Sequence, residues 1–226
     1  MATVTEILPE TAAPPLAGER RILIPRVSWE FYIAFRDELD RWGSRAVRLT
    51  YDRGSLEIMT TGRPHERYKK MLAKLVETLV YELHIAVASG GQMTLRREDL
   101  ERGLEADDCW WIAHEAEMRG REDYDPHNDP PPDLALEIEI TNPLLDKLGI
   151  YAELGVPEIW RCDGQRLEFW RRRDDASYRQ VENSIAFPFL RPDHLLPYLR
   201  IDDDLDETTR LHRFAEWLRE RVKEEG

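Results

Sequence analysis

The sequence predicts an α/β (α+β) domain with a mixed central β-sheet flanked by helices. Three observations support this prediction. Residues 132–155 have the pattern of a strand that runs directly into a helix, turn residues at 52–54 and 163–164 separate pairs of short strands, and residues 64–84 have the pattern of a long amphipathic helix. Strands and helices that mix in this way along a chain favour a sheet covered by helices.

The predicted strand at 132–141 carries acids on one face. Aliphatic residues at 134, 136, 138 and 140 alternate with Asp133, Ala135, Glu137 and Glu139. Successive side chains of a strand point to opposite faces, so one face is aliphatic and the other holds three carboxylates. Such a face is costly unless it binds something of positive charge.

A helix is predicted over 143–154, directly after this strand. Asn142 offers a capping oxygen, Pro143 suits the first helical position, and Gly155 suits the residue past the end. Lys147 falls early in this helix, near the end of the strand. A divalent metal with an anionic substrate would supply the missing charge and a use for the lysine.

The remaining elements follow from periodicity and turn signals. A flexible leader is expected over 1–20 and a short apolar docking segment over 21–27, before a helix that Ser28 caps and that extends to about Trp42. Strands are expected at 47–51, 55–60, 93–97, 104–112, 156–162, 166–171 and 178–181. Helical patterns at 194–199 and 208–223 close the chain. We expect the main domain over 21–200 and a C-terminal helical extension over 201–226.

Composition limits the classes of function. The chain has 226 residues, a formal net charge of −13 and a pI near 5.0, which argues against a protein that coats nucleic acid. It does not exclude a nuclease, because metal-binding carboxylates add acid. No apolar run approaches the roughly 20 residues that cross a bilayer. No secretory signal and no metal or redox spacing of the two cysteines is present, so we expect a cytoplasmic protein with reduced thiols.

Four segments could converge on one site. They contribute Asp107 from 104–112, Glu137 with Glu139 from the acidic face, Lys147, and Glu66 in the first turn of the long helix. Mg²⁺ binds a few carboxylates and keeps several waters, which leaves room for a phosphate. A lysine beside that water can orient it or offset charge on the phosphorus. This set of residue types therefore indicates phosphodiester hydrolysis.

Three segments resemble the Uma family of restriction endonucleases, within the PD-(D/E)xK nuclease superfamily. They are GLEADDCWWI, PDLALEIEIT and the DK of LLDKLGIYAELGVPEIWRCDG, and the resemblance extends over about 27–181. It implies a restriction-endonuclease-like fold in which Asp107 matches the aspartate of the PD element, although Ala106 replaces its proline. Glu137 matches the acid of the (D/E)xK element.

The resemblance also implies roles for the other candidates. Glu139 occupies the position of the usual superfamily lysine, and Lys147 of the next helix takes that role. Glu66 corresponds to a helix acid that supports the metal in several members. Each residue also has a structural interpretation: Asp107 as a turn cap, Glu139 and Lys147 as surface groups, and Glu66 as a helix-start acid.

The predicted function is a Mg²⁺-dependent endonuclease, with Mn²⁺ as a substitute, that hydrolyses DNA. Asp107, Glu137 and Glu139 would hold the metal, and Arg96 with Arg97 would contact phosphates. A homodimer through exposed aromatics of the 156–171 hairpin is expected. Two alternatives stay open: a catalytically silent interaction or nucleic-acid-binding module, and a metal-dependent phosphoesterase that acts on RNA or nucleotides.

Overall fold

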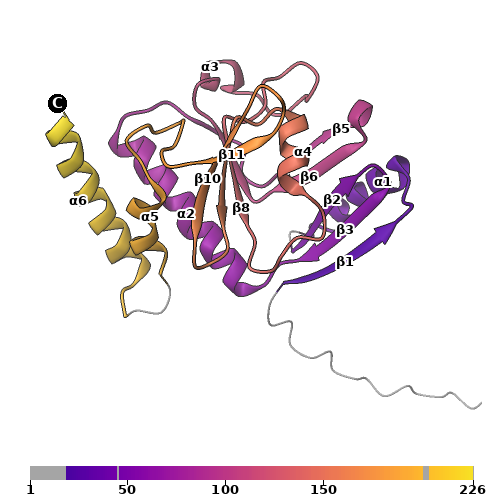
Figure 1. The fold of residues 1–226 in the computed structure, drawn as a ribbon, viewed down its shortest axis with the longest axis horizontal. Coiled ribbons are helices and arrows are strands. Elements are labelled where there is room, and N and C mark those ends of the chain that lie inside the picture. Colours follow the sequence, from indigo (N-terminus) through magenta and orange to yellow (C-terminus); the bar gives the residue numbers. More distant parts are fainter. Residues whose placement is uncertain (1–18, 45, 201–203, 226) are drawn as a thin grey trace, which may run out of the picture.

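The computed structural model describes residues 19–44, 46–200 and 204–225. Within them the chain forms a mixed α+β fold with two β-sheets (Figure 1). Residues 1–18 of the predicted leader lie outside the described residues, and Arg20 already begins the first strand. None of the described helices is long and apolar enough to cross a membrane.

The first sheet is antiparallel, with the strand order β1-β3-β2-β6-β5. Its strands are β1 (Arg20–Pro25), β2 (Val47–Asp52), β3 (Ser55–Thr60), β5 (Met93–Arg97) and β6 (Arg102–Ala106). The docking segment expected at 21–27 is therefore the edge strand of this sheet. Helix α1 (Trp29–Arg41) packs on the sheet through Tyr32 and Leu39, and Ser28 caps it as predicted, accepting from the amide of Phe31.

The second sheet is mixed, with the order β11-β10-β9-β8-β7-β4. Only β8 and β9 run parallel within it. Its strands are β4 (Ala88–Ser89), β7 (Asp108–Trp111), β8 (Leu134–Ile138), β9 (Glu158–Cys162), β10 (Leu167–Arg172) and β11 (Tyr178–Val181). The single central sheet of the prediction is thus two sheets, and the mixed one contains the 132–141 strand.

The two sheets are joined at Asp107. The strand predicted at 104–112 is broken there into β6 of the first sheet and β7 of the second. The Asp107 amide donates to the Leu136 carbonyl (3.2 Å), and its carboxylate accepts from the Ile138 amide (2.8 Å). The Ile138 amide of β8 thus bonds to the Asp107 side chain, where a regular ladder would offer a backbone carbonyl. The regular strand pairing is therefore interrupted at residue 107.

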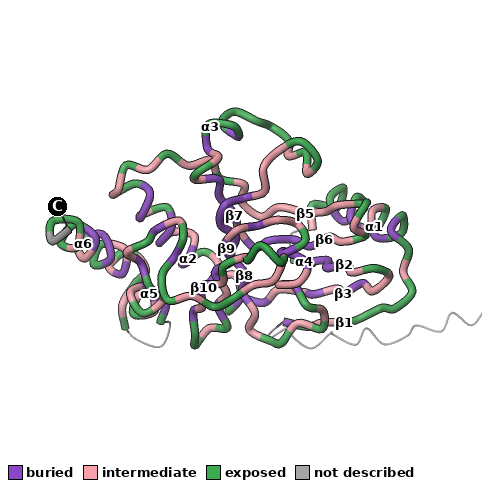
Figure 2. Tube along the Cα trace, turned by 45° about the horizontal axis from the view of Figure 1, so that its top comes forward, coloured by how far each residue is buried: buried purple, intermediate pink, exposed green. Residues whose placement is uncertain are grey.

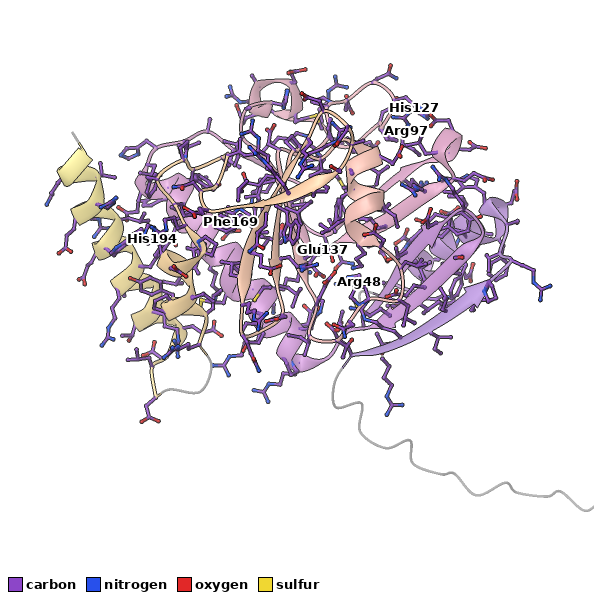
Figure 3. The ribbon with its side chains drawn as sticks, in the orientation of Figure 1. Arg48, Arg97, His127, Glu137, Phe169 and His194 are labelled. Atoms are coloured by element: carbon purple, nitrogen blue, oxygen red, sulfur yellow. The ribbon has the colours of Figure 1, made fainter. Side chains whose placement is uncertain are left out.

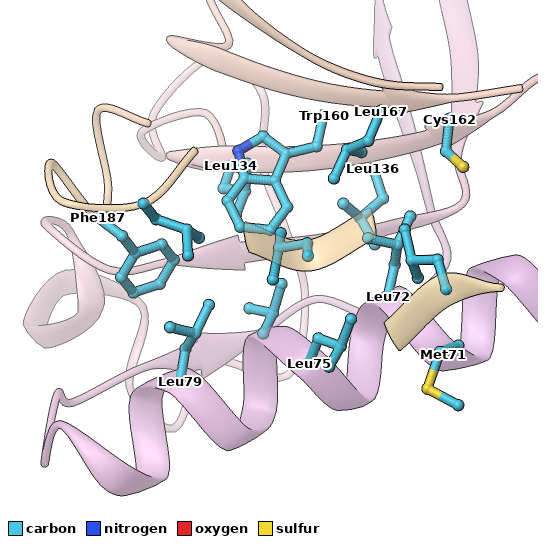
Figure 4. Close-up of a cluster of buried hydrophobic side chains, with 14 of the residues drawn as sticks. Met71, Leu72, Leu75, Leu79, Leu134, Leu136, Trp160, Cys162, Leu167 and Phe187 are labelled. Atoms are coloured by element: carbon cyan, nitrogen blue, oxygen red, sulfur yellow. The ribbon is translucent and has the colours of Figure 1, made fainter. Parts of the chain in front are cut away.

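Helix α2 (Arg63–Glu82) covers one face of the second sheet. Its buried stripe includes Leu72, Leu75 and Leu79, which pack against Leu134, Leu136 and Trp160 (Figure 4). Figure 2 shows the buried residues in the interior and the exposed ones along loops and outer helix faces. The aliphatic face predicted for β8 therefore lies in the core, as the alternation indicates.

The remaining helices are short, apart from the last. They are the 3-10 turn Glu98–Leu100, α3 (Glu115–Met118), α4 (Lys147–Leu154), α5 (Pro192–Leu199) and α6 (Glu207–Glu225). Helix α6 lies beside α2, and Phe214 and Leu218 join the core under the second sheet. Ion pairs Lys74–Glu207 and Arg219–Glu82 fasten the two helices together.

The 156–171 hairpin does not expose the aromatics that were expected to serve a homodimer. Trp160 and Phe169 are fully buried and stack with their ring centroids 4.5 Å apart, and Trp170 is half-buried. The reason is that β9 is an inner strand whose side chains face α2 on one side. The expectation that these aromatics are exposed was therefore wrong, and the homodimer stays a prediction.

Candidate active site

Glu137 is held from two sides by α4. Its carboxylate is fully buried, and it accepts one hydrogen bond from the Lys147 ammonium (2.6 Å) and another from the Tyr151 hydroxyl. Lys147 and Tyr151 are four residues apart, so they lie on one face of the helix, towards β8. The lysine and the acid predicted from the sequence are therefore in direct contact.

Lys147 is a buried cation that three carboxylates act on. Burial raises the pKa of Glu137; the Lys147 ammonium opposes that rise, and the charges of Asp107 and Glu139 add to it. Burial alone would lower the pKa of Lys147, but the carboxylates of Glu137, Asp107 and Glu139 outweigh it and raise that pKa above its ordinary value. Lys147 is thus a buried cation among three carboxylates, suited to donate a hydrogen bond.

Asp107 lies at the junction of the sheets with both oxygens engaged. Its Oδ2 accepts from the Ile138 amide, and its Oδ1 lies 2.8 Å from His65 Nε2. Burial would raise the pKa of Asp107, but the charges of His65, Lys147 and Arg48 hold it well below its usual range. Asp107 is therefore an anion fixed beside the amide that follows Glu137.

His65 joins Asp107 to Glu19. Its Nδ1 lies 2.6 Å from Glu19 Oε1, so the imidazole is sandwiched between two buried carboxylates. Burial alone would lower the pKa of His65, but Asp107 and Glu19 raise it to about 9. At neutral pH the ring is protonated, and both of its N–H groups donate.

Glu66 reaches the site through Arg48. The Arg48 side chain on β2 is 2 % exposed, with Nε 3.6 Å from Asp107 Oδ1 and Nη2 3.6 Å from Glu66 Oε1. Figure 3 shows Arg48 and Glu137 between the two sheets, each from a different sheet. The predicted helix acid therefore lies at the rim of the same constellation.

The segment between β8 and α4 is fastened by acids from distant parts of the chain. Glu57 on β3 accepts from the amides of Leu144 (2.6 Å) and Leu145 (3.0 Å). Glu19 accepts from the amide (2.9 Å) and hydroxyl (2.7 Å) of Thr141. Arg21 donates to both carboxylates and bridges them. This network sets where α4 starts, and hence where Lys147 lies.

The helix predicted at 143–154 consequently starts four residues later. The amides of 144 and 145 bond to Glu57, and Asp146 rather than Asn142 is the cap, accepting from the Gly149 amide (3.1 Å). The N-terminal boundary was wrong because its hydrogen-bond partners are remote in sequence, whereas the C-terminal end at Gly155 is confirmed.

Glu139 lies just past β8, at the open side of the site. Its side chain is 9 % exposed and lies 3.9 Å from Arg161 Nε on the neighbouring β9. Burial raises the pKa of Glu139, and Lys147 and Arg161 oppose the rise. It is therefore close enough to act electrostatically on both Lys147 and Glu137.

The donor set suits a hard divalent cation. Asp107, Glu137 and Glu139 offer carboxylate oxygens. Burial raises the pKa of both glutamates, and the charges of Asp107 and Glu139 add to the rise at Glu137. Among the residues that the structure describes, no group of three or more His, Cys, Asp or Glu side chains is arranged to hold a metal. A pair of carboxylates completed by water is an ordinary Mg²⁺ donor set.

Arg96 and Arg97 lie away from this constellation. Arg97 on β5 makes a bidentate pair with Asp99 (2.7 and 2.6 Å), and it lies far from Glu137 in Figure 3. Arg96 lines a separate hollow of about 510 Å³ beside Trp29 and Pro126. Their predicted contact with nucleic acid stays a prediction.

Asp133, the other acid of the strand, serves the opposite end of β8. It accepts from the amides of Ile112 (2.7 Å) and His114 (3.1 Å) and from the His114 ring. Its role is to fix the turn after β7.

Sequence reasoning did not include several residues of the site. Arg48 and Glu57 are buried charged residues, each between two apolar neighbours in its strand, a signal that could have identified them. Tyr151 has the spacing of an apolar position of its helix, and Glu19 falls within the expected leader. Nothing local to those two positions indicates their partners, because the contacts span 14 residues for Tyr151 and 46 for Glu19.

Comparisons with known proteins identify the family of the chain. The Uma2 family, described as "Putative restriction endonuclease", matches residues 36–203. A search of curated proteins found no match. A solved structure of a "putative nuclease belonging to DUF820 from Anabaena variabilis" is similar at 12 % identity and a TM-score of 0.43, covering 67 % of this chain and 91 % of that one. Because the family match spans most of the chain, the protein belongs to the Uma2 family.

Proposed function

We propose that this protein is a Mg²⁺-dependent endonuclease that hydrolyses phosphodiester bonds in DNA. The observation that carries the proposal is the buried contact of Glu137 with Lys147 beside the junction of the two sheets, where the charge of Asp107 acts on both groups. Family membership supports a nuclease, and acids with one lysine suit phosphodiester chemistry.

In this proposal Asp107 and Glu137 hold the metal, and Glu139 supports it from the open side. When bound, Mg²⁺ would polarise the scissile phosphate and lower the pKa of a bound water. Lys147 donates to the attacking water or to a phosphate oxygen and offsets negative charge there. Tyr151 fixes the Glu137 carboxylate, and His65 fixes that of Asp107, so neither acid has to reorganise.

The direct test is cleavage of supercoiled plasmid DNA by the purified chain with Mg²⁺, Mn²⁺ or EDTA. We expect nicking with either metal, none in EDTA, and a loss of about 10²- to 10³-fold in Glu137→Gln and Lys147→Met. Glu153→Gln, an acid on the same helix outside the site, is the matched control. Equal activity in Glu137→Gln and wild type would contradict the proposal.

A catalytically silent nucleic-acid-binding module is the second candidate. It is favoured by the direct pairing of Glu137 with Lys147 and of Asp107 with His65, since these cations already compensate the acids. The two candidates differ in their response to metal. A silent module should bind DNA equally in Mg²⁺ and in EDTA, and its melting temperature should not change with Mg²⁺ or Mn²⁺.

Substrate and assembly need separate tests. A panel of duplex DNA, single-stranded DNA, RNA and nucleotides distinguishes a DNA endonuclease from a phosphoesterase for RNA or nucleotides. Cutting of both strands would suit a homodimer, which sedimentation velocity checks directly. We expect duplex DNA to be cut fastest and the protein to sediment as a dimer.

A further inference from the structure

A second feature lies beside the candidate site, along the first half of α2. A hollow of about 570 Å³ is formed there between the helix, the start of β2 and the segment before β5. The side chains that matter in it are Arg63, Glu66, Lys69, Lys70, Gln92 and Asp108. Half of these six are cations, in a chain whose net charge is −13.

The cations of this hollow are not used to fasten the fold. Among the described residues, Arg63 and Lys70 form no ion pair, and both are exposed; Lys69 donates to Gln92 (3.4 Å). By contrast, Lys74 one turn further along pairs with Glu207 of α6. Arg63 also lies in the first turn of α2, where the helix dipole disfavours a positive charge. Direct ion pairs within the described part of the fold therefore do not account for Arg63 and Lys70, although the charge of Lys70 also acts on Glu207.

Each acid of the hollow has a partner outside the three cations, although the charge of Lys69 also acts on Asp108. Glu66 lies 3.6 Å from Arg48, and Asp108 accepts from the Cys109 amide (3.0 Å). Glu66 also connects the hollow to the candidate site, since Arg48 lies 3.6 Å from both Glu66 and Asp107. The cationic surface thus borders the carboxylate centre with one arginine between them.

We propose that this hollow binds the phosphodiester backbone of nucleic acid next to the scissile phosphate, through Arg63, Lys69 and Lys70. The inference rests on the proposed function and names where its substrate enters. Flexible lysines and an arginine suit phosphate oxygens without reading sequence, and they account for a local basic surface on an acidic protein. Gln92 adds a neutral donor at the far side of the hollow.

The test is binding of a short fluorescein-labelled DNA duplex to the full-length chain in EDTA, followed by fluorescence anisotropy across a salt series. The variant Arg63→Gln/Lys69→Gln/Lys70→Gln should bind about tenfold or more weakly, and its salt slope should fall by roughly 2 to 3, since each phosphate contact contributes about 0.9. The matched control is Arg171→Gln/Arg173→Gln/Arg179→Gln, which removes three charges from a separate arginine-lined hollow. It should keep both affinity and slope.

The outcomes separate this inference from the nuclease proposal. Unchanged affinity and salt slope in the α2 variant overturn the inference. The nuclease proposal is then tested by the plasmid cleavage assay alone. Displacement of the duplex by millimolar inorganic phosphate also overturns it, because it indicates a site for a small anion. Binding that depends on the three cations, in a protein that cuts no DNA with either metal, supports the inference and contradicts the nuclease. In a protein that cuts, the α2 variant should raise KM and leave kcat unchanged.

Discussion

At the scale of single residues, the candidate site depends on carboxylates whose oxygens are each held by a donor. Lys147 and Tyr151 take the two oxygens of Glu137, and His65 and the Ile138 amide take those of Asp107. Preorganised groups of this kind avoid reorganisation during reaction. Glu137 and Lys147 could be singled out because they lie ten residues apart on consecutive elements, and Asp107 could be singled out through the family resemblance. Tyr151 could not, because its ring also suits an apolar helix face.

Tyr151→Phe should separate this positioning role from packing. The substitution keeps the ring but removes a donor from a buried carboxylate, which costs about 1–3 kcal/mol of unfolding free energy. Activity should fall about 10- to 100-fold, as for other residues that position a ligand. Tyr178→Phe is the control, since that hydroxyl donates to the Val156 carbonyl away from the site. The account is contradicted if both variants cleave plasmid DNA at the wild-type rate.

Glu19 should give the fold a defined dependence on acid. Burial would raise its pKa, but hydrogen bonds from His65 and Thr141 lower it to about 2, against an ordinary 4.5. A carboxyl group whose pKa is lowered in the folded state stabilises the fold at pH values above its unfolded-state pKa. That stabilisation is lost as the pH falls towards 2.

Chemical unfolding at several pH values checks this effect. At pH 7, Glu19→Gln should lower the unfolding free energy by about 2 kcal/mol relative to wild type, and the difference should shrink between pH 5 and pH 2. The exposed Glu98→Gln serves as control and should show no such trend. A difference that is constant with pH would rule out the charge-based explanation.

At the scale of elements, the strand β8 and the helix α4 carry the chemistry, and the sequence predicted them unequally. The alternation over 134–138 predicted β8 correctly. The signal is local, because alternate side chains of this strand enter the hydrophobic clusters on its two faces. The start of α4 was missed, because the amides before it bond to Glu57 of a different sheet. Capping rules consider only residues near the helix end in the sequence, so they cannot identify such a partner.

The cap of α4 predicts a coupling between Asp146 and Gly149. A Cβ added at Gly149 would lie 2.5 Å from Asp146 Oδ2, so alanine there displaces the capping carboxylate. In the wild-type background, the gain of about 1 kcal/mol in helix propensity is offset by the loss of a cap of about 1 kcal/mol.

A double-mutant cycle measured by urea unfolding tests this coupling. Gly149→Ala should leave stability nearly unchanged in wild type but raise it by about 1 kcal/mol in an Asp146→Ala background. Equal effects in both backgrounds would show that the cap does not depend on the missing Cβ.

At the scale of the whole molecule, two sheets meet at one aspartate. β6 and β7 belong to different sheets, and Asp107 is the residue between them, so the site forms only when both sheets have assembled. The sequence predicted the mixed α+β class, but it merged the two sheets into one. The break was not visible because residues 104–112 read as one strand, and only the pairing of Asp107 with β8 interrupts it.

The central claim is that Asp107 and Glu137 together hold one divalent cation in this junction. Calorimetric titration of the full-length chain with Mn²⁺ tests it most directly. The account predicts one site in wild type and in Glu153→Gln, and the loss of that site in both Asp107→Asn and Glu137→Gln while each variant stays folded. Wild-type Mn²⁺ binding in either of these two variants, or no binding in the wild-type protein, would contradict it.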